Sequence, residues 1–133
     1  MAVLIRGERG QSLVELALTL PVLLLLASVI VTLSLAGVAR LAVENAASEA
    51  ARTLALTNDD ELAIATAQAV AAPLRADSLE IGIEPLGPAA RPRGTLVRVG
   101  VAYALPLPFG FAGIGGLRVE GHAARRMEYL DGP

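Results

Sequence analysis

Three sets of residues in this sequence have side chains and spacings that could do chemistry. Gly10 and Glu15 stand just before a long apolar run, where a carboxylate held in a membrane costs a few kcal/mol unless it is paired. Glu80 and Glu84 could form a general acid and base pair, but their alternation with apolar residues favours a solvated strand face. His122 is the only histidine, and one imidazole in a chain without cysteine does not make a zinc site. We therefore predict no catalytic residue, no metal site and no cofactor, which leaves Gly10 and Glu15 as the functional candidates.

The apolar run that follows Glu15 is long enough to cross a membrane. Leu16–Ala39 contains no charged residue, and at about 1.5 Å per residue a helix of this length spans about 36 Å. Arg6 and Arg9 precede the run, and a short basic segment in that position stays on the cytoplasmic side. We predict a transmembrane helix over residues 11–39, with the N-terminus inside and the C-terminal part outside.

Several residues within this run predict how the helix packs. Ala27, Ser28, Ala36 and Gly37 are small, and small residues let the backbones of membrane helices approach closely. Pro21 is tolerated in a membrane helix and predicts a local bend there. These five positions are the predicted helix-packing residues.

Two helical segments are predicted beyond the membrane. Arg40–Leu56 is rich in alanine, contains neither glycine nor proline, and continues the first helix as an amphipathic extension. Asn58 followed by Glu61 has the spacing of a capping box, which predicts a second helix over Asp59–Ala72.

The remaining sequence alternates between apolar and polar residues, which is typical of strands. Strands are predicted over Leu79–Glu84, over Leu96–Leu105, and from Leu117 to near Glu128. Phe109 and Phe111, in a Pro/Gly-rich connection, either plug the core or form an exposed contact, and the scarcity of other aromatic residues favours the core. The predicted fold class is α+β: a long N-terminal transmembrane helix with an amphipathic extension, a second short helix, and a small antiparallel sheet of about three strands whose one face packs on the second helix.

Composition excludes several classes of function. A formal net charge of −2 gives no electrostatic basis for binding nucleic acid. Aromatic residues make up only 3% of the chain, so a soluble domain built from it has a thin core. The sequence contains no phosphate-binding loop and no nucleophile–base pair, so we predict neither a small-molecule substrate nor an enzyme.

The opening motif Gly10-Gln11-Ser12-Leu13-Val14-Glu15 resembles the processing site of the type IV pilin superfamily. In that superfamily a membrane aspartyl peptidase cuts after the glycine and leaves the apolar helix on the mature protein. The resemblance implies cleavage between Gly10 and Gln11. It also implies that Glu15, as the fifth mature residue, pairs with the N-terminus of a neighbouring subunit.

A narrower resemblance, to the TadE/TadG-like pilus-assembly family, covers most of the chain. It rests on Arg6-Gly7-Glu8-Arg9-Gly10, Val14-Glu15-Leu16-Ala17-Leu18, Leu20-Pro21 with the Leu/Val run after it, Asn45–Arg52 and the ending Ala123–Glu128. The family often has an aromatic residue after the glutamate, whereas this chain has Leu16.

This resemblance implies a minor pilin or pseudopilin of a tight-adherence (type IVc, Flp-type) pilus, anchored in the cytoplasmic membrane. Its partners would be a prepilin peptidase, other pilin or pseudopilin subunits, the inner-membrane assembly platform and membrane lipid. The implied organisation is a leader at 1–10, a transmembrane helix at 11–39 and an extracytoplasmic domain at 40–133. Whether the chain enters the extracellular filament or only primes its assembly is left open.

Other interpretations make different predictions. An envelope-anchored binding module outside any filament would keep residues 1–10, and Glu15 would then only reach the headgroups at the membrane boundary. A secretory signal peptide cleaved after Ser34-Leu35-Ala36 would release a soluble domain, but the apolar run exceeds the usual h-region of about 7–15 residues.

Overall fold

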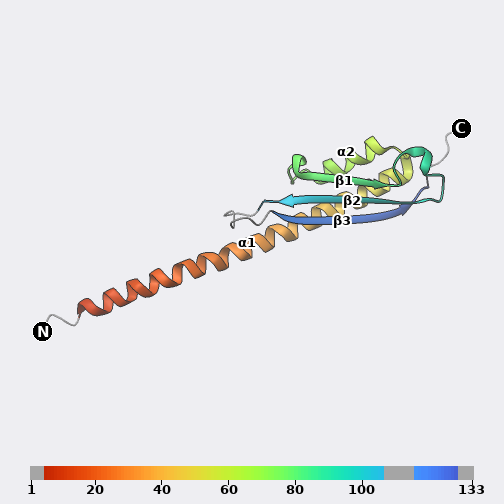
Figure 1. Ribbon diagram of the computed structural model, residues 1–133. Helices are drawn as coiled ribbons and strands as arrows, with labels where there is room; N and C mark the ends of the chain where they lie inside the picture. The colour runs from red at the N-terminus through yellow and green to blue at the C-terminus, as the bar shows by residue number, and fades with distance from the viewer. Residues whose placement is uncertain (1–4, 107–115, 129–133) are drawn as a thin grey trace. The chain divides into compact units, whose positions relative to one another are not determined.

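The structure is a computed structural model of the chain, and it describes residues 5–106 and 116–128, with the backbone alone for 5–9. Its elements follow one another as α1, α2, β1, β2 and β3, with short 3-10 turns, and Figure 1 shows them as an α+β arrangement, as predicted. The chain divides into two compact units, Met1–Ser34 and Leu35–Pro133. Phe109 and Phe111 lie outside the described residues.

Helix α1 comprises Ile5–Thr57 and is the one described helix that is long and apolar enough to span a membrane, judged by length and composition. It begins six residues before the predicted start at Gln11. Extending an existing helix requires no new nucleation, so the residues before Gln11 can continue it at little cost. The helix runs unbroken through Pro21, and the bend predicted there stays a prediction.

Helix α2 comprises Asp60–Val70, and its N-terminus corrects the predicted capping box. Asp59, not Asn58, is the N-cap: its carboxylate accepts hydrogen bonds from the backbone N–H groups of Glu61 (2.9 Å) and Leu62 (3.1 Å). Asn58 instead adopts φ 54°, a left-handed conformation that asparagine tolerates better than most residues. In the turn between the helices, Asn58 therefore supplies the left-handed backbone conformation and Asp59 supplies the capping side chain.

The three strands, β1 (Leu79–Glu84), β2 (Leu96–Leu105) and β3 (Leu117–Arg126), form one antiparallel sheet in the order β1-β2-β3. β3 ends at Arg126, two residues before the predicted end near Glu128, because the chain there bonds to other partners. The N–H of Met127 donates to the carbonyl of Thr95, and the N–H of Glu128 donates to the carbonyl of Ala55 in α1.

The inner face of the sheet packs on the second helix, as predicted, and α1 contributes to the same core. Alanines of α1 line the core on one side and β-branched residues of β2 on the other: Ala39, Ala46, Ala47, Ala50, Ala51, Val97, Val99 and Val101. A Cβ placed on Gly121 of β3 would lie 2.6 Å from the backbone nitrogen of Glu44. Small side chains on both elements therefore allow the helix and the sheet to meet closely, a device that suits a chain with few aromatic residues.

Candidate functional site

The predicted processing site lies inside α1. Gly10, Gln11 and Glu15 are all exposed, and a Cβ at Gly10 would meet nothing within 4 Å. Gln11 and Glu15 are four positions apart on one helix and so share a face. None of the ion pairs among the described residues includes Glu15. The peptide bond between Gly10 and Gln11 is helical in this chain, so a protease that binds an extended substrate must first unwind this turn.

The predicted helix-packing residues fall into different environments. Pro21, Ala27 and Gly37 are exposed, and Gly37 has open space where a Cβ would be. Ser28 is only 8% exposed, and its Oγ has no hydrogen-bond partner among the described residues. Ala36 is half-buried against the core of the second unit. The structure thus uses Ala36 within its own domain and leaves the other positions outside that core.

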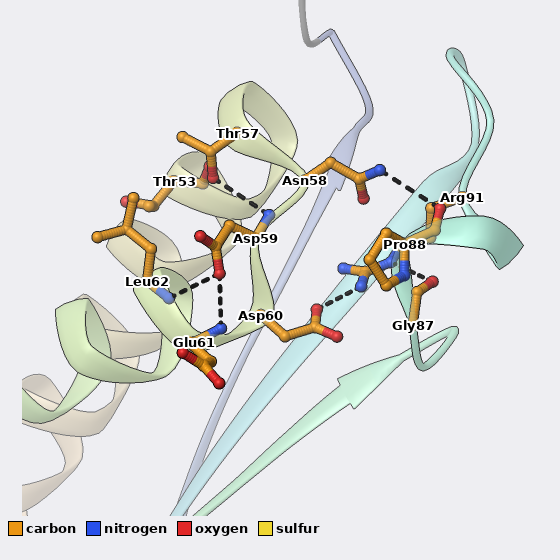
Figure 2. Close-up of polar contacts among 10 residues, drawn as sticks. All are labelled: Thr53, Thr57, Asn58, Asp59, Asp60, Glu61, Leu62, Gly87, Pro88 and Arg91. Carbon is orange, nitrogen blue, oxygen red and sulfur yellow. Dashed lines mark hydrogen bonds and ion pairs between the residues drawn. The ribbon is translucent and has the colours of Figure 1, made fainter.

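The sequence analysis missed a buried polar cluster around Arg91, shown in Figure 2. The Arg91 side chain is fully buried; its Nη2 pairs with a carboxylate oxygen of Asp60 and its Nε donates to the Gly87 carbonyl at 3.0 Å. The Nδ2 of Asn58 donates to the Pro88 carbonyl at 3.3 Å beside it. This cluster ties the α1–α2 junction to the β1–β2 connection. Arg91 lies in a Pro/Gly-rich loop with no periodicity, so nothing in the sequence distinguished it from an exposed loop arginine.

A second polar cluster covers the outer face of the sheet. The guanidinium of Arg118 bridges two carboxylates, with Nη2 2.8 Å from Oε2 of Glu80 and Nε 2.6 Å from Oε1 of Glu120. The second oxygen of Glu120 lies 3.6 Å from Nε2 of His122. The hydrogen bond from Arg118 lowers the pKa of Glu120, and the bonds to Glu120 and Glu80 raise the pKa of Arg118. His122 and both carboxylates are exposed, as predicted for a solvated strand face.

This outer face is a poor candidate for catalysis. Gly82 and Gly100 leave a shallow depression of about 530 Å³ between the charged side chains. Its carboxylate Glu120 is already bonded to a guanidinium, and a carboxylate with a lowered pKa is a weak base. Within 5–106 and 116–128, no three histidine, cysteine or acidic side chains are grouped so as to hold a metal ion.

The decisive comparison concerns α1, which holds the processing motif and the predicted packing residues. Residues 10–52 match the family described as TadE-like protein. The match confirms the resemblance between Gly10 and Arg52, which is about a third of the chain; the resemblance of the ending Ala123–Glu128 stays a prediction. No curated protein and no solved structure matches the chain.

The N-terminal part of this chain is therefore similar to TadE-like proteins. The one long apolar helix within residues 5–106 and 116–128 fits a single-pass membrane anchor. All the matched residues lie within α1, whereas the sheet and both polar clusters lie outside the matched segment.

Proposed function

We propose that this chain is a membrane-anchored minor pilin or pseudopilin that takes part in assembling a tight-adherence pilus after a prepilin peptidase cuts between Gly10 and Gln11. The observation that carries the proposal is the glycine–glutamate spacing at the mouth of the apolar run, inside the segment that matches the TadE-like family. The N-terminus would lie in the cytoplasm and the sheet outside the cytoplasmic membrane.

The proposed chemistry follows from the new N-terminus. Cleavage would leave an ammonium group on Gln11, about 6 Å along the helix axis from Glu15. Glu15 is exposed and makes no ion pair with the other described residues, so its carboxylate is available to a neighbouring subunit. In an apolar medium a carboxylate gains strongly from pairing with an ammonium, which would favour a fixed stagger between adjacent helices.

Lateral packing of the helices would complete the assembly. Gly37 is small and exposed, so another helix backbone can come close to it, and Ala27 adds a second small side chain to the run. Other pilin subunits, the inner-membrane assembly platform and membrane lipid would be the partners.

The test of processing is the N-terminus and intact mass of the membrane-extracted protein, expressed in its host with and without the prepilin peptidase. We expect a start at Gln11 that requires the peptidase and is lost in Gly10→Val. Gly7→Val is the matched control, because it changes a nearby glycine without altering the motif. A start at Met1 in every strain would favour the anchored binding module, and a start at Gly37 would indicate a secreted domain.

The test of assembly is the amount of pilus on the cell surface in a Glu15→Ala strain. We expect it to fall sharply while the protein remains in the membrane. Glu49→Ala, which removes an exposed carboxylate from the same helix outside the apolar run, should leave assembly intact. Normal pili in the Glu15→Ala strain would contradict the proposed pairing.

A further inference from the structure

One end of the sheet lies beside the turn of α1 at which the apolar run ends. Leu105, the last residue of β2, pairs with Leu117, the first residue of β3, and Figure 1 shows the tip of the β2 arrow beside the start of β3. Ala36, Gly37 and Arg40 of α1 line one depression of about 280 Å³ together with residues at the start of β3, including Leu117 and Arg118.

β3 then continues along α1 away from this end. Gly121 lies against Val43 and Glu44, and the N–H of Glu128 donates to Ala55 at 2.9 Å. All of these residues belong to the second unit, so their arrangement is independent of how the first unit is placed. The paired ends of β2 and β3 are therefore level with the last turn of the predicted membrane span, which ends at Ala39.

Apolar side chains are exposed at this level on both elements. Leu35, Val38 and Leu41 of α1 are 45%, 62% and 63% exposed, and Leu117 of β3 is 43% exposed. Leu35 and Val38 belong to the last turns of the apolar run, and Leu41 and Leu117 add exposed apolar side chains beyond its end at Ala39. Exposed apolar side chains that adjoin a membrane segment are expected to sit in the interface, because water is the poorer solvent for them.

The charges nearby suit the same environment. Arg40 and Arg118 border the depression with side chains that are 69% and 55% exposed, although Arg40 pairs with Glu44, and Arg118 pairs with Glu80 and Glu120. Exposed arginines just beyond an apolar surface can reach lipid phosphates while their stems cover apolar groups.

The composition of the intervening sequence agrees with this placement. Between Leu105 and Leu117 the sequence has no charged residue and no side chain that forms hydrogen bonds, and it holds both phenylalanines of the chain. A connection between two strands in water is ordinarily rich in polar residues.

We propose that the surface formed by Leu35, Val38, Leu41 and Leu117 lies in the membrane–water interface and contacts lipid, so that the domain rests on the bilayer and does not stand clear of it. This inference depends on the membrane anchor of the proposed function, but not on processing or on pilus assembly. The occupant of the surface is the bilayer that already surrounds the adjoining apolar run.

The chain has no cysteine and no tryptophan, so single labels report without a background. The full chain would be reconstituted into phosphatidylcholine–phosphatidylglycerol vesicles with a nitroxide on Leu117→Cys. The matched control is Leu86→Cys, an equally simple change at a leucine that is 79% exposed beyond the opposite end of the sheet. Leu25→Cys, within the apolar run, serves as the reference for lipid.

We expect the labels at 25 and 117 to collide more often with oxygen than with a water-soluble nickel chelate, and the label at 86 to show the reverse. The label at 117 should report a depth of about 5–10 Å, as for side chains at the headgroup boundary. As a second measurement, the tryptophan emission of Leu117→Trp should fall by more than half in brominated lipid, and that of Leu86→Trp should be unchanged.

Each other outcome overturns the proposal in a distinguishable way. If position 25 is in lipid and position 117 is as accessible to nickel as position 86, the anchor stands and the domain does not touch the bilayer. If position 117 is shielded from both reagents, a second protein copy covers the surface instead. If position 25 itself is aqueous, the anchor fails and this inference fails with it.

Discussion

The two compact units, Met1–Ser34 and Leu35–Pro133, relate polarity to burial in opposite ways. In the first unit, Leu18 and Leu25 are 71% and 55% exposed; in the second, the charged side chain of Arg91 is fully buried. Exposing leucine to water and burying an unpaired charge both cost free energy. The first unit therefore requires an apolar solvent around it, and the second requires a carboxylate inside it.

The same helix, α1, contributes to both units with different side chains. In the first, leucine and valine occur on all sides, so no face is distinguished. In the second, core positions recur every three or four residues and are mostly alanine: Ala39, Val43, Ala46, Ala47, Ala50, Ala51 and Leu54. Uniform apolar exposure suits lipid, whereas a narrow stripe of alanine suits close packing against a sheet.

The largest expected effect tests the buried charge. Asp60→Asn should leave Arg91 buried without its counter-ion and lower the free energy of unfolding by about 3–5 kcal/mol. Urea unfolding of the full chain in detergent micelles measures this. Glu61→Gln, at an exposed carboxylate next to it, should change little, and the double substitution Asp60→Leu with Arg91→Met should restore most of the loss. Equal stabilities of Asp60→Asn and Glu61→Gln would show that the ion pair contributes nothing.

The next effect tests the apolar solvent. Leu25→Arg places a charge in the middle of the apolar run and should cost about 2.5–3.5 kcal/mol on insertion. Leu56→Arg makes the same change at a 53% exposed position in the second unit and should have little effect. The fraction of protein that resists alkaline extraction from membranes is the measurement. A Leu25→Arg protein that extracts no more readily than Leu56→Arg would refute the membrane assignment.

A smaller effect tests the close approach of helix and sheet. Gly121→Val puts a side chain against the backbone of Glu44 and should destabilise the second unit by about 1–3 kcal/mol. Gly82→Val is the control, because a Cβ there meets nothing within 4 Å and valine favours strands. Amide hydrogen exchange of the sheet would separate the two variants. If both exchange alike, the packing between α1 and β3 is looser than described.

The smallest effect tests the exposed cluster on the outer face. Since Arg118 lowers the pKa of Glu120, Arg118→Gln should raise that pKa back toward 4.5 in a carboxyl NMR titration. The lowered pKa means that the interaction stabilises the fold above pH 4.5 and is lost as the pH falls through the folded-state value. The variant should therefore lose less stability on acidification than the parent chain. Arg98→Gln on the same face is the control, and an unchanged titration of Glu120 in Arg118→Gln would contradict the assignment.

The local elements were predictable because each leaves a periodic signal. The first two strands have the bounds that alternation predicted, and the long helix follows from an uninterrupted apolar and alanine-rich segment. The N-cap predicted at Asn58 is wrong: Asp59 makes the local capping bonds, and the side chain of Asn58 donates to Pro88, thirty residues away. β3 ends two residues before Glu128, because Met127 and Glu128 bond to Thr95 and Ala55. Arg91 and its partner Asp60 are thirty-one residues apart and carry no pattern that links them.

The sequence by itself determined that a long apolar run follows a glycine–glutamate motif similar to that of TadE-like proteins, that an α+β region comes after it, and that the strands alternate apolar and polar residues. These properties depend on residues that are close together in the sequence, so periodicity and spacing are enough to predict them. Only the tertiary structure decided that α1 shares the core with the sheet, that Gly121 allows the close contact, and that Arg91 is buried. It also decided which strand ends lie beside Ala36–Arg40. Those outcomes depend on residues distant in sequence, whose contacts form only when the sheet closes on the helix.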